Sequence, residues 1–157
     1  YMSYIKIAKE MKGVHINWEN NKIFPKYKYN SGPYVSQKRI NKAIKIVIPI
    51  LEDEEDRIKK EFRKFAERRY RGKNVRIKYS FQAAKDKVKN TRVGKEDEDL
   101  HGEANFYKIW ISSNKLSDDE LVGTILHESL HYLATFNGNE ICEKDEHQVM
   151  AKLGDDC

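Results

Sequence analysis

Residues 117–131, Ser-Asp-Asp-Glu-Leu-Val-Gly-Thr-Ile-Leu-His-Glu-Ser-Leu-His, carry the strongest structural signal in the sequence. Ser117 and Glu120 have the spacing of a capping box, and the apolar residues that follow recur at helical intervals. The pattern predicts a helix over residues 118–136 that ends at Asn137-Gly138. Its predicted buried stripe contains Val122, Ile125, Leu126, Ser129, Leu130 and Leu133.

His127 and His131 lie four positions apart in this helix, so their side chains project from one face, one turn apart. Two imidazole nitrogens in this arrangement can bind one Zn²⁺ at about 2.0–2.1 Å each. Glu128 would lie beside such a metal without being a ligand, where it can take a proton from a water whose pKa the metal has lowered. The pattern therefore predicts a metal site with Glu128 as general base. The alternative is a partly exposed histidine pair on an ordinary helix.

A catalytic zinc ion needs a third protein ligand and one open position. Residues 143–153 are predicted to form a final helix, and the turn at Asn137-Gly138-Asn139 lets this helix fold back against the first. Glu143 is the first choice for the third ligand, and His147, one turn later, is the alternative. Weaker candidates are Asp145, Glu146 and Cys142. Acids at a helix start are also favoured by the helix dipole alone.

The remainder of the chain predicts an α+β fold, with helices packed on a small mixed or antiparallel sheet. Residues 52–70 have one apolar stripe, acids in the first turn and bases in the last, which is typical of a helix. Residues 75–81 and 106–112 have the two-residue periodicity of strands. Residues 82–104 are interpreted as a long charged loop.

Toward the N-terminus, residues 4–11 predict a short helix and residues 18–37 a loop. Residues 44–50 are rich in β-branched side chains, but Pro49 lies among them. Because proline within a sheet is confined to edge strands, strand starts and bulges, an edge strand and the start of a helix both remain open for this segment.

The capped helix with His127-Glu128-x-x-His131, the short turn and a second helix bearing an acid or a histidine resemble the minimal core of the zincin metallopeptidases. The resemblance covers residues 52–153, and the sharp match is limited to His127, Glu128 and His131. It implies a zincin-like fold, a Zn²⁺ cofactor, and hydrolysis of peptide bonds by a zinc-activated water with Glu128 as general base. It also implies that an edge strand binds the extended protein or peptide substrate.

Two branches of that family fit the spacing. The gluzincin-like branch uses a helical Glu as third ligand, which would be Glu143. The SprT-like branch, whose members cleave proteins crosslinked to DNA, uses a third histidine, which would be His147. The turn is short for many gluzincins, and the cysteine-rich zinc ribbon of some SprT-like proteins is absent from the sequence. Candidates for stabilising the transition state are Tyr132, Tyr107 and His101.

The composition indicates the kind of protein that this sequence encodes. The 157 residues are 39% hydrophobic and 35% charged, which is enough apolar material for one folded domain. We interpret residues 1–50 as an extension packed on a catalytic core at residues 52–154. Cys142 and Cys157 are too few for a disulfide framework, and no segment approaches the roughly 18 apolar residues of a membrane span. We therefore expect a cytoplasmic protein with no membrane partner.

A basic segment leaves a nucleic-acid partner open. The chain has a formal net charge of +5, which permits an anionic partner. The clustered cations are Arg57, Lys59, Lys60, Arg63, Lys64, Arg68, Arg69, Arg71 and Lys73. The alternative function is a non-catalytic, zincin-like nucleic-acid-binding module. Because Glu61 and Glu67 are interleaved with the cations, a solvated helix face is the simpler interpretation.

Overall fold

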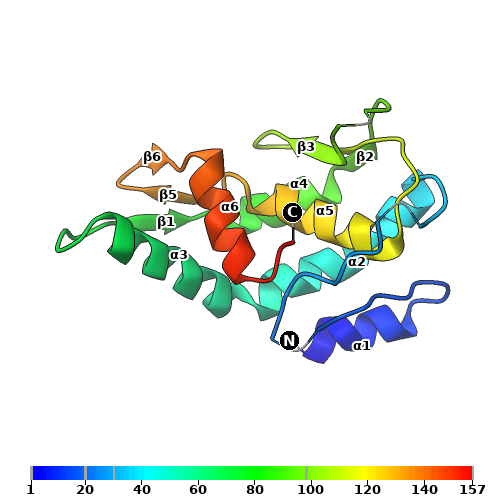
Figure 1. Ribbon diagram of the computed structural model, residues 1–157, viewed down its shortest axis with the longest axis horizontal. Coiled ribbons are helices and arrows are strands. Elements are labelled where there is room, and N and C mark those ends of the chain that lie inside the picture. The colour runs from blue at the N-terminus through cyan, green and yellow to red at the C-terminus, as the bar shows by residue number, and fades with distance from the viewer. Residues whose placement is uncertain (1, 20, 30, 98, 157) are drawn as a thin grey trace.

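Figure 1 shows the computed structural model of the chain, which describes residues 2–19, 21–29, 31–97 and 99–156. The helices are α1 (Met2–Glu10), α2 (Gln37–Asp53), α3 (Glu55–Arg69), α4 (Phe81–Lys89), α5 (Asp118–Leu130) and α6 (Glu143–Lys152). The strands are β1 (Ile77–Tyr79), β2 (Thr91–Val93), β3 (Gly102–Ala104), β4 (Ile109–Ile111), β5 (Ala134–Phe136) and β6 (Asn139–Glu140). The predicted α+β class is confirmed.

The strands form two small sheets rather than one. The first has the order β1-β5-β6 and is antiparallel throughout, with Lys78 opposite Thr135. The second has the order β2-β4-β3, in which β2 runs parallel and β3 antiparallel to β4. Figure 1 shows the first sheet beyond the C-terminal end of α5 and above α3, and the second sheet above α5. Strands β3 and β4 contact α5, and β2 contacts α2. Among the strands of the described residues, β3 pairs with β4 alone, so it is an edge strand of this sheet.

Neither interpretation of residues 44–50 is right, because the segment forms the middle and later turns of helix α2. Residues 44–50 are helical, and Pro49 lies in the last turn and a half of α2. The side chain of Ser36 caps the helix by accepting a hydrogen bond from the amide of Arg39. Its buried side chains, Ile40, Ala43, Ile46, Val47, Ile50 and Leu51, recur at three- and four-residue intervals. Through this face α2 packs against α1, α4 and α5.

Helix α5 has the predicted start and a different end. The capping box is present, because Ser117 Oγ accepts from the Glu120 amide at 3.1 Å and Glu120 Oε1 accepts from the Ser117 amide at 3.3 Å. The helix ends at Leu130, and His131 has an extended backbone with ψ 135. Residues 134–136, predicted to be helical, form β5 instead and pair with β1. The Asn137-Gly138 pair is the turn of the β5–β6 hairpin, with positive φ at both residues.

The prediction of a long charged loop at residues 82–104 is also wrong. This segment contains α4 and two strands. Ala84 and Val88 give α4 a buried face, which the many lysines hide in the sequence.

A single hydrophobic cluster joins the segment before residue 50 to the rest of the chain, from Tyr4 to Leu153. In the described part of the chain, no helix combines the length and the apolar character that a membrane crossing requires.

Asp119, in the first turn of α5, anchors the N-terminal segment and yields a test of the fold. Its Oδ1 accepts a hydrogen bond from the Asn17 amide at 2.8 Å. Burial raises the pKa of the Asp119 carboxyl above its ordinary value, against the lowering effects of Asn17 and Lys28. The folded chain therefore holds a proton that the unfolded chain releases, and stability falls as the pH rises between the two pKa values.

We expect Asp119→Asn to remove this dependence while keeping an acceptor for Asn17. As the pH rises from about 3 to 7, the wild type should lose stability through this carboxyl and the variant should not. The free energy of unfolding of the variant should therefore rise relative to that of the wild type. Urea unfolding at several pH values measures it. A difference that stays constant or shrinks with rising pH would contradict the burial of a carboxyl whose pKa is raised.

Candidate metal site

Three histidines converge where α5 meets α6. Their ligand-capable nitrogens all lie within 4.8 Å of one another. Nε2 of His131 is 3.2 Å from Nε2 of His127 and 3.3 Å from Nε2 of His147. His127 lies in the last turn of α5, His131 at its C-cap, and His147 in the middle of α6. The structure thus brings the two predicted histidine ligands together with the alternative third one.

Two buried carboxylates orient two of these imidazoles. Nδ1 of His127 lies 2.5 Å from Oδ2 of Asp155, and Nδ1 of His131 lies 2.9 Å from Oε1 of Glu146. The side chains of both acids are nearly inaccessible. An Nδ1–H that donates to a carboxylate leaves the Nε2 lone pair unprotonated, which is the tautomer that binds a metal. In the neutral imidazoles of His127 and His131, whose Nε2 atoms are 3.2 Å apart, these lone pairs would face one position.

Burial and neighbouring charges act in opposite directions on these histidines. Burial lowers the pKa of His127, but the hydrogen bond and charge of Asp155, with smaller contributions from Glu128 and Glu143, leave it raised. For His147, burial and the two neighbouring histidines outweigh the carboxylates and lower the pKa. A site that gathers imidazoles beside carboxylates is suited to a cation.

The end of α5 is fixed by polar contacts from two other helices. Nζ of Lys87, on α4, donates to the carbonyl oxygen of His131 at 2.8 Å. The amide of Tyr132, a residue with φ +66, donates to Oε2 of Glu146 at 2.9 Å. These bonds satisfy backbone groups that a continued helix would have paired internally, so the chain leaves the helix at His131.

Glu128 lies beside the histidines and is 8% exposed. Burial raises the pKa of its carboxyl, while the charges of His127, His131 and Lys87 lower it by less. Among the described residues, none donates a hydrogen bond to its carboxylate. Burial also lowers the pKa of Lys87 to about 8, although Glu128 and Glu146 oppose that shift. A buried carboxylate with a raised pKa next to a group of metal-capable nitrogens is a candidate general base.

These groups open into a cleft of about 630 Å³. Strand β3, the first half of α6, His127, His131 and Glu128 all line this cleft. Tyr132 also lines the cleft, and its ring lies 4.6 Å from that of Phe106. A concave site with a few convergent polar groups is typical of a binding or catalytic site.

The other candidates from the sequence occupy different positions. Glu143 Oε1 lies 3.6 Å from Nε2 of His147, and 76% of the Glu143 side chain is exposed. Glu146 is the acceptor for His131, and Asp145 is partly buried. Cys142 and His101 line the cleft, whereas Tyr107 is 80% exposed and does not.

Sequence reasoning missed Asp155, Lys87 and Tyr27. The hydroxyl of Tyr27 donates to Oδ1 of Asp155 at 3.2 Å. Asp155 lies after the glycine that ends α6, and Lys87 is one of many lysines, so neither carries a local signal. Only their tertiary positions distinguish them from solvated charges.

Comparison of the chain with protein-family models, with curated proteins and with solved structures gives no match.

Proposed function

We propose that the protein is a zinc-dependent metallopeptidase, in which His127, His131 and His147 hold Zn²⁺ and Glu128 is the general base. The observation that carries this proposal is the convergence of three imidazoles, two of them oriented by buried carboxylates, beside a buried glutamate. Between the two third ligands predicted from the sequence, this geometry favours His147 over Glu143.

The residues fit a zinc ion. Nitrogens bound tetrahedrally at about 2.0–2.1 Å are separated by roughly 3.3 Å. The two closest separations, 3.2 and 3.3 Å, agree with this value. Two Nε2 lone pairs at this distance repel each other, and a cation between them turns the repulsion into attraction. Neutral imidazoles, with carboxylates behind them, are ligands that zinc prefers.

When bound, Zn²⁺ supplies a Lewis acid that polarises a carbonyl group and lowers the pKa of water. Glu128 is placed to accept a proton from an attacking water and to return it to the leaving amine. Its burial favours this exchange, because a carboxylate with a raised pKa is a stronger base. The carboxylates of Asp155 and Glu146 keep the imidazoles oriented during both steps.

The open edge of β3 supports a peptide as the substrate. Residues 102–104 line the cleft, and β4 occupies the opposite edge of the strand. An extended peptide can add to such an edge through main-chain hydrogen bonds and lie across the site. Its scissile bond would then pass beside the histidines and Glu128.

Zinc content and the Glu128→Gln variant test this proposal. We expect close to one zinc ion per chain by elemental analysis of protein purified without added metal. Glu128→Gln should retain the metal and lose about 10²–10⁴-fold in kcat, because the proton acceptor is removed. Glu140→Gln, at an exposed residue that lines the same cleft, is the matched control and should cleave peptides normally. Full activity of Glu128→Gln would contradict the mechanism.

The third ligand has its own test. His147→Ala should weaken zinc binding by more than about 100-fold, because a direct ligand is lost. Glu143→Ala should weaken it by less than about tenfold, since its carboxylate is largely exposed. Competition with a chromogenic chelator gives both affinities, and Gln148→Ala, at an exposed residue of the same helix, is the control. The reverse order would assign the third ligand to Glu143.

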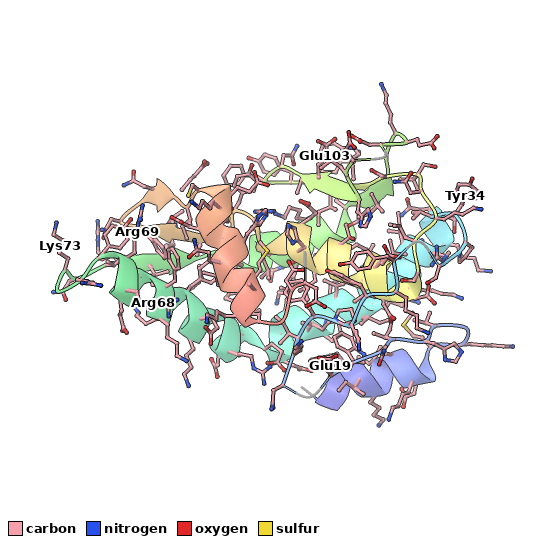
Figure 2. All side chains as sticks on the ribbon, in the orientation of Figure 1. Glu19, Tyr34, Arg68, Arg69, Lys73 and Glu103 are labelled. Carbon is pink, nitrogen blue, oxygen red and sulfur yellow. The ribbon has the colours of Figure 1, made fainter. Side chains whose placement is uncertain are left out.

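The charge distribution favours a second candidate function, binding to nucleic acid. Residues 57–78 contain eleven Lys or Arg and two Glu, a local net charge of +9 against +5 for the whole chain. Figure 2 shows Arg68, Arg69 and Lys73 together at one end of the molecule, away from Glu103 on β3. These three cations are exposed and form no ion pair with any residue in the described ranges. A protease acting on DNA-bound proteins would use both this surface and the cleft.

Salt dependence tests the second candidate. The logarithm of the binding constant for duplex DNA should fall linearly with the logarithm of the salt concentration. In the Arg68→Gln/Arg69→Gln/Lys73→Gln variant this slope should be shallower by about 0.9 per lost phosphate contact. Fluorescence anisotropy of labelled DNA measures the slope. A control with Lys9, Lys38 and Lys45 changed to Gln removes equal charge elsewhere. Equal slopes for both variants would exclude a specific nucleic-acid surface at this end.

A further inference from the structure

Tyr27 connects the N-terminal segment to the candidate metal site. Its hydroxyl donates to Oδ1 of Asp155 at 3.2 Å, while Oδ2 of the same carboxylate lies 2.5 Å from Nδ1 of His127. Tyr27 is 9% exposed and Asp155 is 7% exposed. The two carboxylate oxygens thus face different partners, one from the N-terminal segment and one from α5.

Gly123 provides the seat for the Tyr27 ring. A Cβ atom at this position of α5 would lie 2.1 Å from Cε1 and 2.5 Å from the hydroxyl oxygen of Tyr27. Gly123 lies four residues, or about one helical turn, before His127. The missing side chain therefore lets the tyrosine ring lie against the helix that carries His127.

Residues 22–27, which we call the strap, are fixed by two backbone hydrogen bonds that precede Tyr27 in the chain. The amide of Ile23 donates to the carbonyl oxygen of Leu153 at 3.1 Å, and the amide of Lys26 donates to that of Asn17 at 2.7 Å. Ile23 and Phe24 are fully buried. Figure 1 shows the chain after α6 returning to α5 beside the segment that leads into α2. The strap therefore contacts Leu153, two residues before Asp155, as well as the Asp155 carboxylate.

We propose that Tyr27 is a positioning residue of the metal site, which sets the orientation of His127 through Asp155. The proposal rests on the metal site of the proposed function and not on peptide hydrolysis. It assigns residues 22–27 to the site, although the strap contains no metal ligand.

The hydroxyl of Tyr27 limits the freedom of the Asp155 carboxylate. A histidine ligand binds metal best when its second nitrogen donates to an acceptor of fixed position. The Asp155 carboxylate can rotate about its terminal torsion, which is a soft one. The hydroxyl of Tyr27 on Oδ1 restricts that rotation and keeps Oδ2 in line with Nδ1 of His127. Loss of the hydroxyl loosens the acceptor and, through it, the imidazole.

Tyr27→Phe is the decisive variant, because it removes the hydroxyl and keeps the ring that packs on Gly123. Zinc affinity is measured by competition with a chromogenic chelator on the full chain. We expect Tyr27→Phe to weaken binding about three- to tenfold and Asp155→Ala about 10–100-fold. If the tyrosine acts through the carboxylate, adding Tyr27→Phe to Asp155→Ala should change the affinity no further.

Tyr79→Phe is the matched control. Tyr79 is half-buried, and its hydroxyl donates to the carbonyl oxygen of Lys59 at 3.1 Å, on a helix that carries none of the three histidines. This variant loses a comparable hydrogen bond, so it should lose stability but bind zinc as the wild type does. Thermal unfolding of the metal-free proteins compares the two losses of stability.

The outcomes separate this proposal from the proposed function. Unchanged zinc affinity in Tyr27→Phe, or an equal loss in the presence and absence of the Asp155 carboxylate, would overturn the role of Tyr27 and leave the metallopeptidase intact. A wild-type protein that binds no zinc would overturn both. A protein that binds zinc with the expected order of affinities but cleaves no peptide would support the role of Tyr27 and contradict the peptidase.

Discussion

The carboxylate of Glu146 holds together the part of the structure on which the candidate site depends. One oxygen accepts from Nδ1 of His131 and the other from the amide of Tyr132. The first contact orients an imidazole, and the second supports a residue with positive φ where the chain leaves α5. Because Glu146 belongs to α6, the same contacts fix that helix against α5 and bring His147 to the other histidines. The end of α5, the packing of α6 against α5 and the orientation of the His131 imidazole thus all depend on the buried Glu146 side chain.

This arrangement concentrates ionisable groups in a buried place, at a cost in desolvation that the surrounding contacts offset. Glu128, Glu146 and Asp155 are all less than one-tenth exposed, and Lys87 is the nearby cation. Lys87 donates to the His131 carbonyl oxygen and also lies 5.4 Å from the centre of the Tyr132 ring. Buried charges of this kind are retained where they hold a particular geometry, at the expense of stability that apolar residues would provide. The two contacts of Lys87 fall on the residues that terminate α5.

The sequence predicted the parts of this site that have local signals. The capping box located the start of α5, and the His127-x-x-x-His131 spacing placed two imidazoles on one side of it. The end of α5 could not be predicted, since Leu133 and Phe136 suit a helix and a strand equally. Pairing with β1 and the contacts from Lys87 and Glu146 favour the strand over the helix. Lys87 and Glu146 lie 44 and 15 residues away from His131 in the sequence. Helix α4 was missed because its apolar face is narrow and its lysines dominate the composition.

The contact between Tyr27 and Asp155 joins residues 128 positions apart, and that between Asn17 and Asp119 spans 102. Contacts between residues so far apart in the sequence form slowly. The intervening chain must lose conformational entropy before such a contact contributes to stability. During synthesis on the ribosome, α5 emerges with both of its histidines well before Asp155 can be reached. The nascent chain therefore exposes two imidazoles without the carboxylate and the tyrosine that later orient one of them. The carboxylate and hydroxyl that orient His127 join it only after residues 27 and 155 have come together.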